Sequence, residues 1–184
     1  MSTTLLIGIA AVVLLLFFVF VYNRLTKKRI MVKEGWSGIG TFLQQRNDMI
    51  PNLVETVKGY AVHESQTLEN VVKWRNRAVA AKTPAEQMDA GNHVNQALMD
   101  FFAVAEQYPD LKANTNFLSL QNDLKEMETR INQSRRYYNG TVREYNQSVA
   151  VFPNNLVAGV FRFSPEPFFE EESISREVPR VRFN

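Results

Sequence analysis

The sequence predicts an all-α protein, in which a single N-terminal transmembrane helix continues into an antiparallel up-and-down four-helix bundle, followed by an irregular aromatic C-terminal tail. Three observations predict this class. The chain begins with an apolar run that carries no charge. Apolar residues then recur at helical spacing over most of the chain. No segment alternates polar and apolar residues as a half-buried strand does.

The overall composition excludes several classes of function. The 21 Lys and Arg residues nearly balance the 19 Asp and Glu residues, which argues against a nucleic-acid binder, because such binding relies on phosphate neutralisation. The chain has no cysteine, so disulfides, thiolate chemistry and Cys-based zinc sites are excluded. We predict no nucleic-acid partner and no small-molecule substrate.

Residues 5–22 are predicted to cross a membrane, with residues 1–4 outside. They form an 18-residue stretch without a charge, LLIGIAAVVLLLFFVFVY. A helix of that length reaches about 27 Å, close to the ~30 Å hydrocarbon thickness of a bilayer. The alternative is a cleaved signal peptide. No basic side chain precedes the run and no small-residue cleavage site follows it, so we expect an uncleaved anchor.

Basic residues lie only after this span, in a juxtamembrane segment at residues 23–35. By the positive-inside rule, they predict a cytoplasmic location for the rest of the chain. Four of them are candidate membrane-surface residues, because each can attract anionic lipid by about 1 kcal/mol: Arg24, Lys27, Lys28 and Arg29. The simpler interpretation is that they only set the topology.

Four amphipathic segments follow and are predicted to form the bundle over residues 36–152. The first continues directly from the span and ends near residue 62. The second covers residues 66–82, and the third begins with the Thr83-Pro84 cap and ends before Pro109. The fourth runs from about residue 114 to Phe152. Short connections predict antiparallel neighbours.

Pro51 lies inside the first of these helices. It leaves the carbonyl of Asn47 without its helical donor, at a cost of about 3 kcal/mol. We expect a bend between Asn47 and Pro51, with water or a side chain supplying the missing donor. One interpretation is that the bend only curves the helix around its core. The other is that it sets the angle between the membrane anchor and the bundle, or offers a hinge.

Arg46 interrupts the apolar stripe of the same helix. When the first and fourth helices are aligned at the end far from the membrane, Arg46 lies level with Glu128 and Asn132. A partly buried Arg46–Glu128 pair would fix the register of the bundle. The alternative is that Arg46 extends along its stem to solvent.

Two connections meet at the end of the bundle far from the membrane. Loop residues on a rigid scaffold often carry binding, so the candidate partner site comprises Tyr60, His63, Glu64, Tyr108, Asp110 and Lys112. The alternative is that these residues only cap helices and form turns. The His63-Glu64 pair does not continue into a zinc motif, because Thr67 stands where the second histidine belongs. We predict no catalytic residue, metal or cofactor.

The tail, residues 153–184, is rich in proline and phenylalanine. Four aromatic side chains are too many to leave exposed without a partner, so they are candidate contacts with a second subunit or with lipid: Phe161, Phe163, Phe168 and Phe169. We favour a groove on a neighbouring subunit, where Glu170, Glu171 and Glu172 would meet Lys27, Lys28 and Arg29. The alternative is the lipid interface.

Besides the N-terminal anchor, four stretches of the sequence are distinctive: RNDMIPNLVETVKGYAVHES, YPDLKANTNFLSLQNDL, ETRINQSRRYYNGTVREYNQ and FPNNLVA. In their order and spacing they resemble the LemA family over nearly the whole chain. The resemblance implies a bacterial inner-membrane protein with a cytoplasmic helical body, and it brings no catalytic activity or cofactor. One relative is associated with the magnetosome membrane.

Two functions are therefore expected. The first is a non-enzymatic membrane-anchored scaffold that self-associates as a homo-oligomer and organises or shapes the bilayer. The second is an adaptor that recruits a cytoplasmic partner or a membrane protease through the distal end of the bundle.

Overall fold

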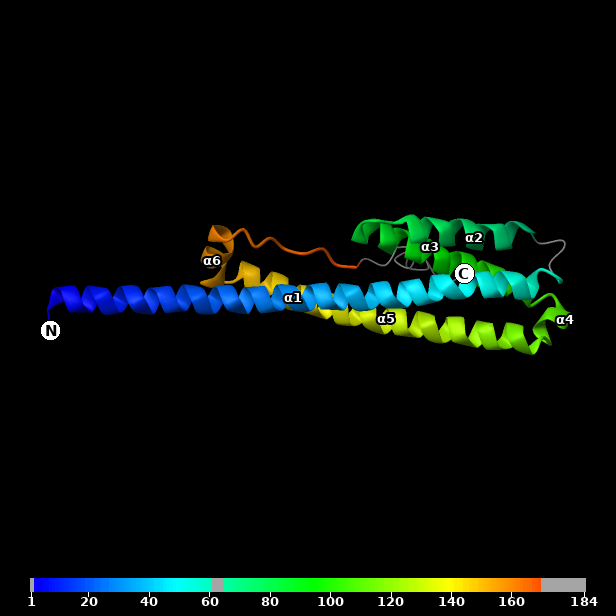
Figure 1. The fold of residues 1–184 in the computed structure, drawn as a ribbon, viewed down its shortest axis with the longest axis horizontal. Helices are drawn as coiled ribbons and strands as arrows, with labels where there is room; N and C mark the ends of the chain where they lie inside the picture. The colour runs from blue at the N-terminus through cyan, green and yellow to red at the C-terminus, as the bar shows by residue number, and fades with distance from the viewer. Residues whose placement is uncertain (1, 61–64, 170–184) are drawn as a thin grey trace, which may run out of the picture. The chain divides into compact units, whose positions relative to one another are not determined.

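The structure is a computed structural model of the 184-residue chain, and it describes residues 2–60 and 65–169. Within these ranges the chain is helical and contains no strand, as predicted (Figure 1). The helices are α1 (Thr3–Val57), α2 (Ser65–Ala80), α3 (Pro84–Ala105), α4 (Pro109–Lys112), α5 (Thr115–Ala150) and α6 (Asn154–Val160).

The chain divides into two compact units. The first combines Met1–Gly40 with Gln133–Phe168, and the second is built on Thr41–Asn132. Both long helices, α1 and α5, pass from one unit into the other. Each unit has its own buried side chains.

Helix α1 confirms the prediction that the apolar N-terminal helix continues without a break. It runs for 55 residues through Pro51 to Val57. An 18-residue window of α1 has a mean hydropathy of 3.1, and only 6% of that window is buried. Among the described residues, α1 is the one helix that is long and apolar enough to cross a membrane.

In the first unit, α1, α5 and α6 supply the buried side chains. The apolar ones come from Val21, Leu25, Val32 and Ile39 of α1, Tyr138, Val142, Tyr145 and Val149 of α5, and Val157 and Ala158 of α6. Gly35 marks a close approach of α1 to α5, because a Cβ added there would lie 3.4 Å from the Cα of Tyr138. This is ordinary van der Waals contact, so alanine would fit at this position, whereas a side chain that extends beyond Cβ would have to displace its neighbours.

The second unit has a core to which five helices contribute. Its fully buried members are Ile50, Leu53 and Val57 of α1, Val71 of α2, Val94, Leu98 and Phe101 of α3, Leu111 of α4, and Phe117 and Leu124 of α5. This core contains apolar residues that the helical spacing had assigned to the inward faces.

The start of α3 has the predicted capping box. The Thr83 hydroxyl accepts a hydrogen bond from the Glu86 N–H, and the Glu86 carboxylate accepts one from the Thr83 N–H. The backbone N–H of Lys82 donates to the same carboxylate. These bonds to Lys82 and Thr83 lower the pKa of Glu86, because they favour its charged form.

Two short helices were not predicted. Pro109 was expected only to end α3, but it also opens α4, where a proline at the first helical position loses no hydrogen bond. Helix α6 lies in the tail that was predicted to be irregular. A helix of seven residues is too short for a clear periodicity in the sequence, and its buried residues are Val157 and Ala158.

Candidate functional site

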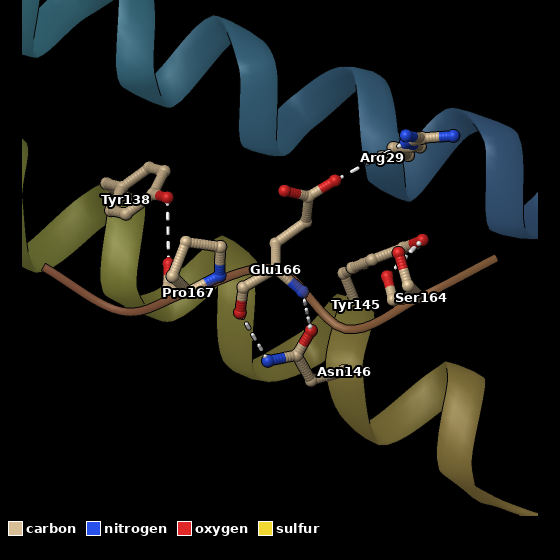
Figure 2. A network of polar contacts seen from close by, with 7 residues as sticks. All are labelled: Arg29, Tyr138, Tyr145, Asn146, Ser164, Glu166 and Pro167. Atoms are coloured by element: carbon tan, nitrogen blue, oxygen red, sulfur yellow. Dashed lines mark hydrogen bonds and ion pairs between the residues drawn. The ribbon is translucent and has the colours of Figure 1, made fainter. Parts of the chain in front are cut away.

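In the first unit, residues 163–168 form an extended segment, here called the strap, that lies along α5 (Figure 2). The side-chain amide of Asn146 holds both backbone groups of Glu166. Its Nδ2 donates to the Glu166 carbonyl at 2.9 Å, and its Oδ1 accepts from the Glu166 N–H at 2.8 Å. Because the strap has no secondary structure, such side-chain bonds supply partners that a helix would otherwise provide.

Two tyrosines of α5 hold the strap on either side of this clamp. The Tyr138 hydroxyl donates to the Pro167 carbonyl at 2.8 Å, and the Tyr145 hydroxyl donates to the Ser164 carbonyl at 3.1 Å. Figure 2 shows both hydroxyls directed at the backbone of the strap. Four hydrogen bonds between the strap and three side chains of α5 therefore fix the path of this six-residue segment.

An ion pair joins the strap to α1. The Arg29 Nε lies 3.4 Å from the Glu166 carboxylate. Burial raises the pKa of Tyr138, and the negative charge of Glu166 adds to this effect. The pKa of Tyr145 is also raised, mainly by burial, with Arg29 opposing and Glu166 reinforcing the shift. Both hydroxyls are thus kept in the neutral form that can donate.

The four candidate membrane-surface residues fall into two pairs. Lys28 forms an ion pair with Glu144 at 3.3 Å, and Arg29 pairs with Glu166. Arg24 and Lys27 are exposed. Two of the four therefore have acidic partners within the chain, and lipid attraction by this cluster stays a prediction.

The tail phenylalanines do not share one environment. The rings of Phe161 and Phe163 contact Tyr22 at the end of the span, with centroid distances of 4.9 and 5.6 Å. Phe168 is 42% exposed, whereas Phe169 is only 3% exposed. Their contact with a second subunit or with lipid stays a prediction, and Glu170, Glu171 and Glu172 lie outside the described residues.

In the second unit, Arg46 forms the predicted pair with Glu128. The Arg46 Nη1 lies 3.0 Å from the Glu128 carboxylate, and its Nη2 donates to the Gly91 carbonyl of α3 at 3.0 Å. Arg46 is only 1% exposed, so the alternative that it extends to solvent is wrong. The pair links α1 to α5, and the second bond links α1 to α3.

A side chain satisfies the Asn47 carbonyl that Pro51 leaves without a helical donor. The Arg75 Nε of α2 donates to it at 3.2 Å. Sequence reasoning anticipated a side chain or water here, but it could not identify Arg75, which belongs to another helix. The bend between Asn47 and Pro51 stays a prediction.

The candidate distal-end site is described only in part. The Tyr60 hydroxyl accepts a hydrogen bond from the Asn114 side chain at 3.2 Å, which joins the end of α1 to the start of α5. Lys112 forms an ion pair with Glu106. Asp110 is exposed and Tyr108 is half-buried. His63 and Glu64 lie outside the described residues.

No arrangement suited to metal binding occurs among the described residues. None of their His, Cys, Asp and Glu side chains gather in groups of three or more that could hold an ion. His93 stacks on Trp74 with ring centroids 3.9 Å apart and lies 3.6 Å from Asp89. His93 therefore packs against Trp74 and pairs with Asp89.

The described fold defines a class: an all-helical protein whose first helix is apolar enough to cross a membrane and also enters a helical core. The LemA family model matches residues 35–183, and the chain therefore belongs to the LemA family.

Among curated relatives, the chain is 26% identical to Protein LemA of Metamycoplasma hominis, covering 86% of this chain and 75% of that protein. It is 24% identical to magnetosome protein MamQ 2 of Paramagnetospirillum magneticum, covering 74% of this chain and 60% of the relative. It is 22% identical to magnetosome protein MamQ of Magnetospirillum gryphiswaldense, covering 84% of this chain and 64% of that relative. The chain thus spans less than two thirds of the length of these MamQ proteins.

Proposed function

We propose that this chain is a single-pass scaffold of the bacterial inner membrane, with its N-terminus outside and its helical body in the cytoplasm. The observation that carries the proposal is the composition of α1. Its N-terminal window is strongly apolar and almost entirely unburied, whereas Ile50, Leu53 and Val57 near its other end are buried in a helical core. Such a helix needs lipid at one end and protein at the other.

The charges around the span support the orientation. Arg24 and Lys27 follow the span directly and are exposed. Basic residues are retained on the cytoplasmic side during insertion. We further propose that α1, α2, α3 and α5 form an antiparallel four-helix bundle in the second unit, since all four contribute to one core and short connections join successive helices.

Protease protection tests the topology. Protease added to the outside of intact spheroplasts should leave the helical body whole, and permeabilised spheroplasts provide the matched control. Mass spectrometry of the purified protein should find Met1 or Ser2 at its N-terminus. Digestion of the body from outside would overturn the orientation, and a chain that begins after residue 22 would overturn the anchor.

We propose that the scaffold self-associates and carries out no reaction of its own. Two relatives are named as magnetosome proteins, names that refer to a cellular structure rather than to a reaction. The exposed ring of Phe168 supports a contact between subunits through the tail. An exposed phenylalanine gains roughly 1.5–3 kcal/mol when it is buried by a partner.

The mass of the detergent-extracted particle tests self-association. A scaffold should give a large homogeneous assembly from purified protein alone. Phe168→Ser should reduce its mass if the tail joins subunits, whereas Val79→Ser removes an apolar side chain that is 59% exposed on α2 and should leave the mass unchanged. If the original chain is itself extracted as a monomer, the proposed self-association is overturned.

One observation supports an adaptor as the second candidate. The bond from Asn114 to Tyr60 holds the distal ends of α1 and α5 together and leaves Tyr60 41% exposed. An exposed aromatic side chain fixed in this way suits a protein partner. An adaptor would be extracted as a monomer that gains mass only with cytoplasmic proteins, and Tyr60→Ala would abolish that gain.

A further inference from the structure

Helix α6 lies in a part of the sequence without charged residues and exposes several apolar side chains. Between Glu144 and Arg162 the sequence has no charged residue. Within this interval the large apolar side chains are exposed to an unusual degree: Val151 44%, Phe152 78%, Leu156 57%, Val160 69% and Phe161 49%. Water-soluble proteins rarely gather so many exposed apolar side chains in one short segment.

The other side of α6 is already used. Val157 and Ala158 are buried within the first unit, at 0% and 3% exposure. Leu156 and Val160 are four residues apart, so they share one side of the helix. One side of α6 therefore packs on protein, and Leu156 and Val160 on another side of the helix are apolar but uncovered.

The position of α6 indicates what covers this face. Helix α6 lies beside α1 (Figure 1), and the Phe161 ring contacts Tyr22 at the end of the span. Phe161 also borders an apolar groove of about 520 Å³, whose other walls come from the span and include Leu14, Leu15 and Phe18. These span residues face hydrocarbon in a membrane-anchored chain, so Phe161 shares that environment.

We propose that α6 and its flanking residues, 151–161, form a second membrane contact beside the span, with Leu156, Val160 and Phe161 in lipid acyl chains. The inference rests on the proposed membrane anchor. Apolar residues on a short helix can lie in the boundary between headgroups and acyl chains. Arg162, the first charge after the segment, is exposed and can remain at the headgroups. The α6 segment and the strap then hold the end of α5 to both membrane and α1.

Site-directed spin labelling of the full chain tests the inference, because the protein has no native cysteine. Leu156→Cys and Val160→Cys are labelled and reconstituted in vesicles of phosphatidylcholine and phosphatidylglycerol. Collisions with oxygen, which concentrates in acyl chains, are compared with collisions with a water-soluble nickel complex. Leu14→Cys labels the span, and Val79→Cys labels an exposed position on α2.

We expect oxygen to dominate at positions 14, 156 and 160 and nickel to dominate at position 79. Nickel dominance at 156 and 160, with oxygen dominance at 14, would overturn the inference and leave the anchor standing. Nickel dominance at 14 would overturn the anchor itself. Immobile labels at 156 and 160 that neither reagent reaches would mean that a second copy of the chain covers this face, and this would also overturn the inference.

Discussion

Arg46 of α1 and Glu128 of α5 form an ion pair with 3.0 Å between Nη1 and Oε2, and the two side chains are 1% and 21% exposed. The pair is therefore asymmetric: the arginine side chain is enclosed, whereas the glutamate side chain is partly exposed, although its carboxylate Oε1 is buried. Removing one partner of such a pair leaves the other charge uncompensated, and the cost depends on how deeply the remaining charge is buried.

Glu128→Gln should therefore destabilise the protein more than Arg46→Met. We expect a loss of roughly 3 kcal/mol for Glu128→Gln, because it removes the carboxylate charge that pairs with a buried guanidinium. Arg46→Met should cost less, about 1 kcal/mol, since the Glu128 side chain is 21% exposed and its carboxylate can turn to water once Arg46 is gone, while methionine fills the apolar site. Denaturant unfolding of both variants and of the double variant Arg46→Met/Glu128→Leu measures the difference. Equal losses for the two single variants would contradict the asymmetry.

The bond from Arg75 to the Asn47 carbonyl predicts coupling between Arg75 and Pro51. Arg75→Ala should cost about 1–2 kcal/mol, because it leaves a carbonyl without a donor. Pro51→Ala restores the helical N–H to that carbonyl, so Arg75→Ala should cost much less in the Pro51→Ala background. Pro51→Ala alone should leave the protein equally or more stable. A double-mutant cycle on unfolding free energies measures the coupling, and strict additivity would contradict it.

Regular helical spacing explains which features the sequence could predict. Arg46 and Glu128 could be placed level because each lies on a long helix whose rise per residue is fixed. The Asn146–Glu166 clamp could not be predicted, because it joins a helix to a segment with no periodicity, and nothing local to Asn146 indicates its partner. The same holds for Arg75, whose target carbonyl is defined by tertiary packing. Tyr60 could be assigned to the distal end, but its bond from Asn114 depends on how the chain turns between helices.

The two hydrogen bonds of the Asn146 amide predict local release of the strap when they are removed. Asn146→Ala should raise the population of the released strap about 30-fold, because two bonds of roughly 1 kcal/mol each are lost and about 1.4 kcal/mol corresponds to a tenfold change. Trypsin cleavage after Arg162 measures this population when opening is fast relative to cleavage. Asn122→Ala changes an exposed asparagine of α5 and provides the comparison. Unchanged cleavage in Asn146→Ala would show that the tyrosines alone hold the strap.

The raised pKa values of Tyr138 and Tyr145 predict release of the strap at alkaline pH. An unfolded tyrosine has a pKa of about 10, and in the folded chain burial, as the largest cause, raises both values above it. The folded chain then retains protons that the unfolded chain has lost, so stability falls as pH rises above about 10. The stability that the two neutral tyrosines contribute is fully present below that pH, and it is lost as the pH rises through the pKa values of the folded chain. A tyrosinate also cannot donate to the carbonyls of Pro167 and Ser164.

Tyrosinate absorbance and the rate of trypsin cleavage after Arg162, followed together through an alkaline titration, measure this effect. We expect cleavage to accelerate as the two tyrosines ionise. Tyr138→Phe should accelerate cleavage already at neutral pH and weaken its further rise, because one of the two ionising donors is gone. Tyr137→Phe removes the neighbouring hydroxyl from a side chain that is 54% exposed, and it should leave the profile as in the original chain. A cleavage rate that does not change when the tyrosines ionise would mean that Asn146 and the Arg29–Glu166 pair hold the strap without them.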